Sequence, residues 1–151
     1  MRHVPVCVLG ALLSALESAH AQSPPATGAQ GKVVALNGRV EHTEAVQERW
    51  TAARMLQPLL VAERVRTLEA SRASILFIDE TQVNLNAGAV LTVREVRTAT
   101  RPASSMELQR GEAWFRTKNP RSGLTVQTPA AAAAIRGTEI NVRIGRLAKP
   151  S

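Results

Sequence analysis

Side chains that commonly carry catalysis are scarce in this chain of 151 residues. It contains three histidines, one cysteine, one aspartate and no tyrosine, and of these only His42 and Asp79 lie outside the N-terminal segment discussed below. A Ser-His-Asp triad needs a hydroxyl, a base and an orienting carboxylate within mutual reach, so it would have to use these two residues. His42 lies in a polar segment, and Asp79 begins a turn, where its carboxylate can accept backbone N–H groups. We therefore predict no catalytic residues and no enzymatic activity.

Metal and cofactor sites are not indicated either. A zinc site needs three or four ligands of the histidine, cysteine or carboxylate type, and the chain has no phosphate-binding loop or dinucleotide fingerprint. Two carboxylates that face each other across a cleft could hydrolyse a glycoside. No spacing marks such a pair among Glu63, Glu69, Glu80, Glu107, Glu112 and Glu139. We predict neither a metal nor a cofactor.

The two tryptophans, Trp50 and Trp114, are the remaining residues that suggest a ligand. Both could line a groove for a glycan, and the formal net charge of +7 suits the anionic polymers of a cell envelope. Lone tryptophans more often anchor a small core. A carbohydrate-binding or peptidoglycan-binding module of the envelope therefore stays as an alternative function.

The first 21 residues have the form of a secretory signal peptide. A positive charge at Arg2 precedes an apolar run at 4–16, and a small-x-small ending predicts cleavage after Ala21. The run is well short of the ~20 residues that cross a bilayer, so we expect no membrane span after cleavage. The predicted organisation is a signal peptide at 1–21, a flexible leader at 22–30, a folded domain at 31–146 and a C-terminal tail at 147–151.

Cleavage leaves the net charge at +7, because it removes one basic residue, Arg2, and one acidic residue, Glu17. The arginines of the remaining chain are scattered rather than clustered, and a secreted protein has little occasion to meet DNA or RNA. No cysteine remains, so the fold must be stabilised by packing. We predict a periplasmic protein that binds no nucleic acid.

Short runs with a period of two predict an all-β fold. The alternating apolar residues include Val65, Ile75, Phe77, Val83, Leu85, Leu91 and Val93. Turns are expected at 79–81 and 86–88. Asn37-Gly38 is a hairpin signal between two short strands, and a further pair of strands, 105–109 and 112–116, is joined at Arg110-Gly111. Trp114 and Phe115 should lie on opposite faces of the second of these.

About eight to ten short strands in this length are too many for one flat sheet, so we predict a two-layer β-sandwich or β-roll. The segment 43–56 is ambiguous. Val46, Trp50, Ala53 and Leu56 have helical spacing behind a Thr43 cap, which indicates one short helix or a turn.

The stretch TPAAAAAIRGTEINVRI, residues 128–144, carries conflicting signals. Five alanines favour a helix, but Pro129 biases Thr128 towards extended backbone, and a helix of five residues is marginal alone. We predict extended backbone through the alanines and a bend at Gly137 before a strand around Ile140. Arg136 is expected to reach a carbonyl or carboxylate and Thr138 to begin that strand, with a ligand role of Arg136 as the less favoured alternative.

The order of these signals resembles the FecR-type periplasmic domain from Gly31 to about Ile144. The matching segments are GKVVALNGRVE, a tryptophan, RVRTLEASRASILFIDETQVNLNAGAVLTV, ELQRGEAWFRT and VQTPAAAAAIRGTEINV. The most specific pieces are the triplets 65–67 and 136–138, with Thr128-Pro129 ahead of the second. The candidate interaction or structural residues are Arg66, Thr67, Trp114, Arg136, Gly137 and Thr138.

Two turns depart from the family pattern. Ala62 and Glu63 stand where the family usually has glycine and aspartate, and the turn at 79–81 lacks its glycine. A residue that adopts positive φ without steric cost is missing at both places. We expect looser or differently shaped turns there.

The resemblance implies a function class. The best-known members of the family are transmembrane regulators, whose periplasmic part receives a signal from an outer-membrane siderophore transporter and whose cytoplasmic part controls a sigma factor. This chain shows neither that cytoplasmic part nor a membrane span. The resemblance therefore implies a stand-alone secreted FecR domain, a non-enzymatic signalling or protein-interaction module of the periplasm or cell envelope.

The partner expected from this class is an envelope protein, bound by strand addition at a sheet edge or through the basic surface. Two alternatives remain beside it. One is the carbohydrate-binding or peptidoglycan-binding module described above. The other is a truncated FecR domain, because the family pattern commonly continues with further strands after the last one seen here.

Overall fold

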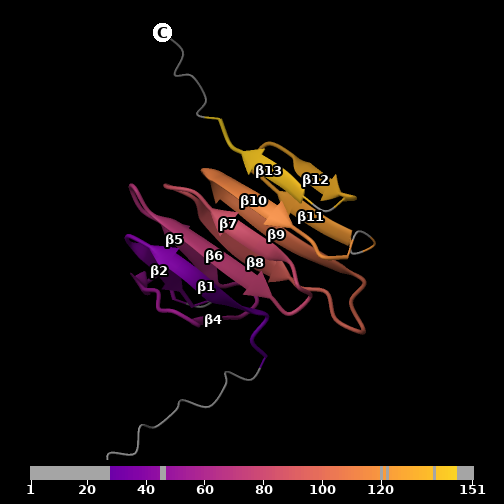
Figure 1. Cartoon of the computed structure of the whole chain (residues 1–151), viewed down its shortest axis with the longest axis horizontal. Helices are drawn as coiled ribbons and strands as arrows, with labels where there is room; N and C mark the ends of the chain where they lie inside the picture. The colour runs from indigo at the N-terminus through magenta and orange to yellow at the C-terminus, as the bar shows by residue number, and fades with distance from the viewer. Residues whose placement is uncertain (1–27, 45–46, 120, 122, 138, 146–151) are drawn as a thin grey trace, which may run out of the picture.

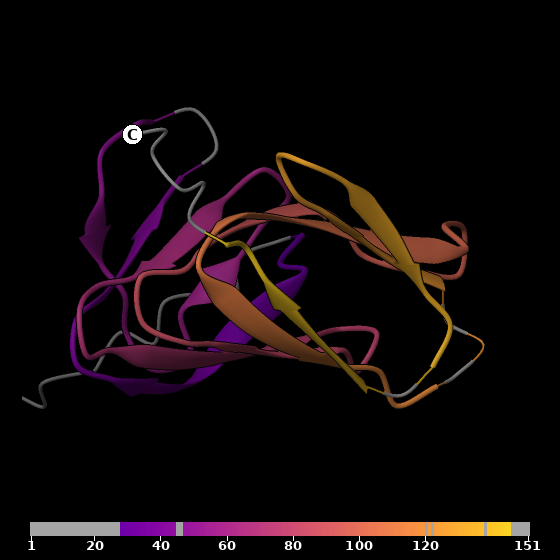
Figure 2. The ribbon, with the colours of Figure 1, turned by 90° about the horizontal axis from the view of Figure 1, so that it is seen from above.

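The computed structural model describes residues 28–44, 47–119, 121, 123–137 and 139–145. The expected signal peptide, most of the leader, Val46, Thr138 and the C-terminal tail lie outside these residues. Within the described part the chain forms thirteen strands in two sheets and no helix. The sheets pack face to face as two layers (Figure 1, Figure 2), which confirms the predicted β-sandwich.

Each sheet draws its strands from the whole length of the domain. The six-stranded sheet has the order β13-β10-β7-β6-β1-β4 and consists of β1 (Gly31–Asn37), β4 (Pro58–Leu59), β6 (Arg72–Phe77), β7 (Gln82–Leu85), β10 (Glu112–Arg116) and β13 (Glu139–Arg143). The seven-stranded sheet has the order β12-β11-β9-β8-β5-β2-β3 and consists of β2 (Val40–Thr43), β3 (Thr51–Ala52), β5 (Arg64–Thr67), β8 (Val90–Glu95), β9 (Ala103–Arg110), β11 (Gly123–Gln127) and β12 (Ala132–Ile135). Neighbouring strands are antiparallel, except for β9 and β11, which run parallel.

The core lies between the sheets and is formed by every second residue of the strands. The alternating apolar residues predicted from the sequence are all buried, and they are Val65, Ile75, Phe77, Val83, Leu85, Leu91 and Val93. Phe115 points into this core with 1% of its surface exposed, whereas Trp114 lies half-buried on the opposite face. Full burial of one such side chain stabilises the fold by roughly 1.5–3 kcal/mol.

The strands predicted on either side of the two glycine turns are confirmed, but they do not pair as hairpins, because each turn carries the chain from one sheet to the other. β1 and β2 flank Asn37-Gly38 but belong to different sheets, and so do β9 and β10 at Arg110-Gly111. Gly38 and Gly111 have φ values of 76° and 86°. A Cβ at Gly111 would lie 2.6 Å from the Ala89 Cα, so this crossing needs glycine.

The helix considered for 43–56 is absent from the described residues of that segment. The Thr43 hydroxyl donates to the Gln47 carbonyl instead of accepting a backbone N–H, and the Gln47 N–H donates to the Glu44 carbonyl across a turn. The chain then pairs with β2 as β3, and Leu56 is 62% exposed. The apolar spacing therefore does not mark a buried helical face.

Ala132, Ala133 and Ala134 are extended, as predicted, whereas Ala130 lies in the bend before them. Ala132 to Ile135 form β12, paired with β11 in the register Gln127↔Ala132 to Leu124↔Ile135. The strand before it ends at Gln127, directly ahead of Thr128-Pro129. Alanine's helix propensity is overridden here by pairing with β11 and by the proline.

The turns that lack glycine use the backbone conformation that glycine favours. Ala62 and Glu80 have φ values of 68° and 65°, and Leu56 and Ala70 have values of 59° and 51°. The left-handed conformation costs a residue with a Cβ roughly 1–2 kcal/mol. The substituted turns therefore keep a left-handed residue at an energetic cost.

Candidate functional site

The six candidate residues do not form one site. Arg66 lies on the outer face of the seven-stranded sheet, while its neighbour Thr67 is buried on the inner side. Trp114 lies on the outer face of the other sheet. Arg136 and Gly137 occupy the link between β12 and β13, and Thr138 lies outside the described residues.

Arg66 is part of a stacked group on the seven-stranded sheet. Its guanidinium lies 4.2 Å from the centre of the Trp50 ring, and Arg64 lies 5.3 Å from the same ring. The Arg66 Nε donates to the Glu41 carboxylate at 2.7 Å across the β2–β5 pair. Trp50 is thus covered by cations and contributes to stability by cation–π attraction.

Thr67 is a structural residue at the end of β5. Its hydroxyl donates to the Asn86 carbonyl at 2.5 Å and accepts from the Ala89 N–H at 3.0 Å. With 1% of its surface exposed, Thr67 joins β5 to the loop between β7 and β8 and contacts no solvent.

Arg136 is exposed and makes no hydrogen bond or ion pair to any described residue, so the partner expected for it is not found there. Gly137 bends the chain between β12 and β13, as predicted, and its carbonyl accepts from the Thr117 hydroxyl at 2.9 Å. Its φ lies outside the left-handed region, and a Cβ there would meet nothing within 4 Å. Gly137 therefore needs neither positive φ nor close approach.

His42 and Asp79 lie in different environments. The Asp79 carboxylate accepts from the Thr81 N–H and the Ser104 hydroxyl. His42 is 8% exposed, its Nε2 lies 3.2 Å from the Thr51 hydroxyl, and its Nδ1 has no hydrogen-bond partner among the described residues. Among the described residues no carboxylate is hydrogen-bonded to His42, as a triad would require.

Glu63 is a buried carboxylate near His42. Burial raises its pKa, while the Leu60 N–H at 2.9 Å and the charge of His42 act in the opposite direction. Because that carboxylate is bound to Leu60, it serves as a turn-forming group. The described part of the chain contains no cluster of histidine, cysteine or carboxylate side chains that could hold a metal ion.

β12 is an edge strand without the usual protection. The edges β3 and β4 have two residues each, and β13 carries Glu139 and Arg143. β12 consists of three alanines and Ile135, with no charge and no proline. Short or charged edge strands discourage pairing with another chain, and β12 has neither feature.

The outer backbone groups of β12 can be assigned from the turn before it. The Thr128 N–H donates to the Ala131 carbonyl at 2.7 Å, so these residues form a hydrogen-bonded pair. Hydrogen-bonded and non-hydrogen-bonded pairs alternate in an antiparallel ladder. Ala132 and Ala134 therefore direct their N–H and C=O groups away from β11, and both residues are exposed.

The outer face of the six-stranded sheet carries an ordered set of polar side chains, which we call the polar face. The register of the paired strands, extended by one residue past the end of β7, places these side chains in three rows. Each row crosses β1, β6, β7, β10 and β13. The middle row is Ala35, Ser74, Asn84, Trp114 and Asn141; the flanking rows are Asn37, Arg72, Asn86, Glu112 and Arg143, and Lys32, Leu76, Gln82, Arg116 and Glu139. With strands about 4.8 Å apart, each row spans roughly 19 Å.

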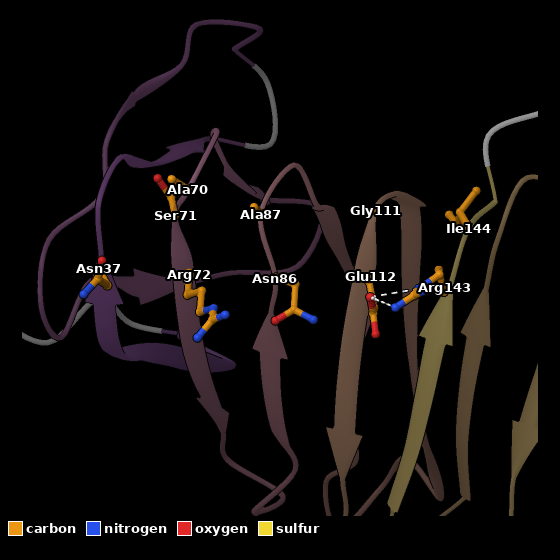
Figure 3. A pocket seen from close by; sticks show the side chains of 10 residues that line it. All are labelled: Asn37, Ala70, Ser71, Arg72, Asn86, Ala87, Gly111, Glu112, Arg143 and Ile144. Carbon is orange, nitrogen blue, oxygen red and sulfur yellow. Dashed lines mark hydrogen bonds and ion pairs between the residues drawn. The ribbon is translucent and has the colours of Figure 1, made fainter.

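A groove of about 730 Å3 runs along the row that contains Arg72 and Glu112. Figure 3 shows Arg72, Asn86, Glu112 and Arg143 side by side at the ends of neighbouring strands. Hydrogen bonds from Asn141 at 2.6 Å and from Arg143 at 2.9 Å lower the pKa of Glu112. The groove is thus lined by one carboxylate in its ionised form, two guanidinium groups and amides.

Sequence analysis identified Trp114 but not the polar residues around it. The signal was present in the strand pattern, because β6, β7, β10 and β13 each place Asn, Ser, Arg, Glu or Gln at the positions opposite the core residues. These positions can be joined into one surface only when it is known which strands lie side by side. The stacking of Trp50 on Arg64 and Arg66 was also missed.

The described residues form a β-sandwich with a polar outer face and one edge strand that carries neither charge nor proline. The protein-family comparison gives the class of protein: the model described as FecR protein matches residues 63–148, more than half of the chain. The chain belongs to the FecR family, and it is therefore a signalling or interaction module of the FecR type. The comparison with curated proteins gave no match, and neither did the comparison with solved structures. Among the described residues no helix is long and apolar enough to cross a membrane.

Proposed function

We propose that this protein is a non-enzymatic FecR module of the periplasm that binds an envelope protein by adding a strand of that partner to β12. The observation that carries the proposal is the free edge of β12, where Ala132 and Ala134 direct their backbone groups outward. Strand addition obtains its affinity from such groups. The methyl side chains of β12 leave room for an approaching strand.

Two further observations support the periplasmic location and the role without catalysis. The N-terminal sequence has the signal-peptide pattern described above, which supports export to the periplasm. The unpaired Nδ1 of His42 and the engagement of Asp79 with Thr81 and Ser104 support a role without catalysis.

The edge is tested by the substitution Ala134→Pro. Proline removes an N–H that points away from β11, so the ladder inside the sheet is retained while the outer edge is blocked. The matched control is Ala52→Pro. The Ala53 N–H donates to the Val40 carbonyl at 2.9 Å, so Ala52, one residue along, directs its N–H to the opposite edge of the same sheet.

The measurement is affinity capture from a periplasmic extract, with thermal unfolding recorded for each variant and Ala134→Lys as a second blocking substitution. We expect a specific protein to be captured by wild type and by Ala52→Pro and lost with both Ala134 variants. Capture of no specific protein by the folded wild type would refute the proposal. Equal capture by all variants would remove β12 as the binding edge.

Localisation has a separate test. We expect the protein in the periplasmic fraction to begin at Gln22 when its N-terminus is determined by mass spectrometry. Recovery in the cytoplasm with an intact N-terminus would contradict the periplasmic assignment.

A further inference from the structure

Trp114 lies in the middle row of the polar face, on β10. Its neighbours in the ladder are Asn84 on β7 and Asn141 on β13. The core residues Ala113 and Phe115 on either side of it point inward, so the ring of Trp114 belongs to the outer surface. Its indole N–H makes no hydrogen bond to any described residue. A half-buried aromatic ring with a free donor at its edge is suited to a ligand that has both apolar and polar sides.

The polar side chains beside Trp114 are held in place by one another. The Ser74 hydroxyl donates to Asn84 at 2.6 Å, and the Asn141 amide donates to Glu112 at 2.6 Å. These contacts fix the orientation of planar amide and carboxylate groups before any ligand binds. Pre-ordering of this kind lowers the entropy lost on binding.

Arg72 is the group in the groove that lacks a partner. It is exposed and makes no hydrogen bond or ion pair to any described residue, whereas Arg143 is bound to Glu112. Asn37 and Asn86 stand on either side of Arg72 in the row (Figure 3). A guanidinium binds carboxylates through paired hydrogen bonds. Of the described residues that line the groove, Arg72 is thus the one cation without a partner, and it lies between two amides.

From this arrangement we propose that the polar face binds an acidic glycan, with a sugar ring stacked on Trp114 and a carboxylate of the chain bound by Arg72. The C–H face of a sugar ring supplies the apolar side that an indole ring contacts. Its hydroxyl groups match the amides of Asn84, Asn86 and Asn141, which both donate and accept hydrogen bonds. The groove of about 730 Å3 is lined by the row that contains Arg72 and not by Trp114, which lies in the neighbouring row, so the glycan has to extend from the groove across to the middle row.

Other occupants fit this face less well. A protein interface needs a desolvated apolar or aromatic centre, and here Trp114 is surrounded by amides and ion pairs. Nucleic acid is disfavoured because proteins bind single strands by stacking successive bases on several aromatic rings, and Trp114 is the one aromatic ring in the three rows described above. The polar face and the β12 edge belong to different sheets. The test of glycan binding at the polar face is therefore independent of the test of strand addition at β12.

The test uses the substitution Trp50→Phe as its background. The chain has two tryptophans, so the fluorescence of this variant reports Trp114 alone. The probes are oligogalacturonate, an acidic glycan, and an oligomer of N-acetylglucosamine of the same length, a neutral one. We expect oligogalacturonate to change the Trp114 emission in a saturable way, and the neutral oligomer to bind about tenfold more weakly because it offers no carboxylate to Arg72.

Calorimetry on variants separates the contact of Arg72 with the carboxylate from the contact of Trp114 with the sugar ring. Arg72→Gln should weaken binding of oligogalacturonate about tenfold and leave the neutral oligomer unchanged. Trp114→Leu keeps an apolar side chain but has no flat ring, and it should weaken both probes about tenfold, whereas Trp114→Phe should retain most of the binding. Arg94→Gln, on the outer face of the other sheet, is the control for loss of one positive charge.

Three results would overturn the proposal. The first is an absence of saturable binding of oligogalacturonate to the folded protein. The second is equal binding by wild type, Arg72→Gln and Trp114→Leu. The third is a self-associated species in sedimentation velocity that is lost in Trp114→Leu, because that would assign the polar face to a second copy of this chain.

Discussion

At the scale of single residues, the chain uses left-handed backbone at Leu56, Ala62, Ala70 and Glu80, none of which is glycine. Two of them are tied to strands by their backbone N–H groups: Ala62 donates to the Val93 carbonyl of β8 at 2.7 Å, and Leu56 donates to the Val33 carbonyl of β1 at 2.8 Å. At these two positions the strain is therefore maintained by the sheets and is not a property of the turn sequence. The conformation could not be predicted from the sequence, because alanine and glutamate rarely adopt it.

Replacement of Ala62 by glycine should stabilise the protein. Glycine relieves the left-handed strain but loses more backbone entropy on folding, which leaves a net gain of roughly 0.5–1 kcal/mol. The free energy of unfolding by urea measures it. Ala87→Gly is the control, since Ala87 is exposed and its φ is not positive, and it should not stabilise. An equal gain in both variants would show that the strain at Ala62 is not the cause.

Thr67 provides the second residue-scale prediction. Thr67→Val keeps the shape of the side chain but removes the hydroxyl that bonds Asn86 and Ala89. It should reduce the free energy of unfolding by roughly 1–3 kcal/mol, because the Ala89 N–H stays buried without that partner. Thr67→Ser, which retains the hydroxyl, should lose less than Thr67→Val in the same urea titration. If Thr67→Val lowered the free energy of unfolding no more than Thr67→Ser does, Thr67 would need a role other than this contact.

At the scale of elements, the strands with a clear period of two were predictable and their partners were not. β5, β6 and β7 follow the pattern because their inner faces are buried. β3 and β4 have two residues each, too few for a pattern, which accounts for two of the strands by which the thirteen in the described chain exceed the expected eight to ten. A glycine turn such as Asn37-Gly38 shows that the chain reverses, but not whether the next strand joins the same sheet.

The same limit applies to the candidate site. Trp114 could be selected by residue type, since only two tryptophans exist. The groove could not, because Asn37, Arg72 and Glu112 come from strands far apart in the chain and meet only through the register of the sheet.

The link between β12 and β13 supports a prediction about a motif glycine. Gly137→Ala should leave the fold intact and raise the free energy of unfolding by roughly 0.4–1 kcal/mol, because the position is open, its φ is not left-handed, and alanine restricts the unfolded chain. Gly111→Ala is the contrasting variant, with φ at 86° and Ala89 in the way. In thermal unfolding, the Tm of Gly137→Ala should rise relative to wild type and the Tm of Gly111→Ala should fall. A comparable fall in Tm in both variants would mean that Gly137 is needed for a conformation other than the one described here.

At the scale of the whole molecule, buried and paired carboxylates make opposite contributions to the pH dependence of stability. Burial raises the pKa of Glu63 above the ordinary value of 4.5, so its contribution is fully present below 4.5 and is lost as the pH rises through its folded pKa. A hydrogen bond from Arg94 lowers the pKa of Glu107, whose contribution is present above 4.5 and is lost as the pH falls.

Neutral variants should separate these two contributions. Relative to wild type, Glu63→Gln should gain stability as the pH rises above 4.5, because glutamine avoids the buried charge and its side-chain oxygen can still accept from Leu60. Glu107→Gln should lose stability relative to wild type over the rise from acid pH to 4.5. Urea titrations from acid to neutral pH measure both differences. Parallel curves for Glu63→Gln and wild type would show that Glu63 is not desolvated in the folded protein.

The parallel pairing of β9 and β11 has a consequence for the order in which the domain assembles. Between these strands the chain leaves for the other sheet as β10, so we expect β11 to dock after β9 has paired with β8. The hairpin of β11 and β12 is then attached to its sheet through a single ladder. It forms a unit that can open while the remaining strands stay paired, and its amide hydrogens should exchange with solvent earlier than those of β6 and β7.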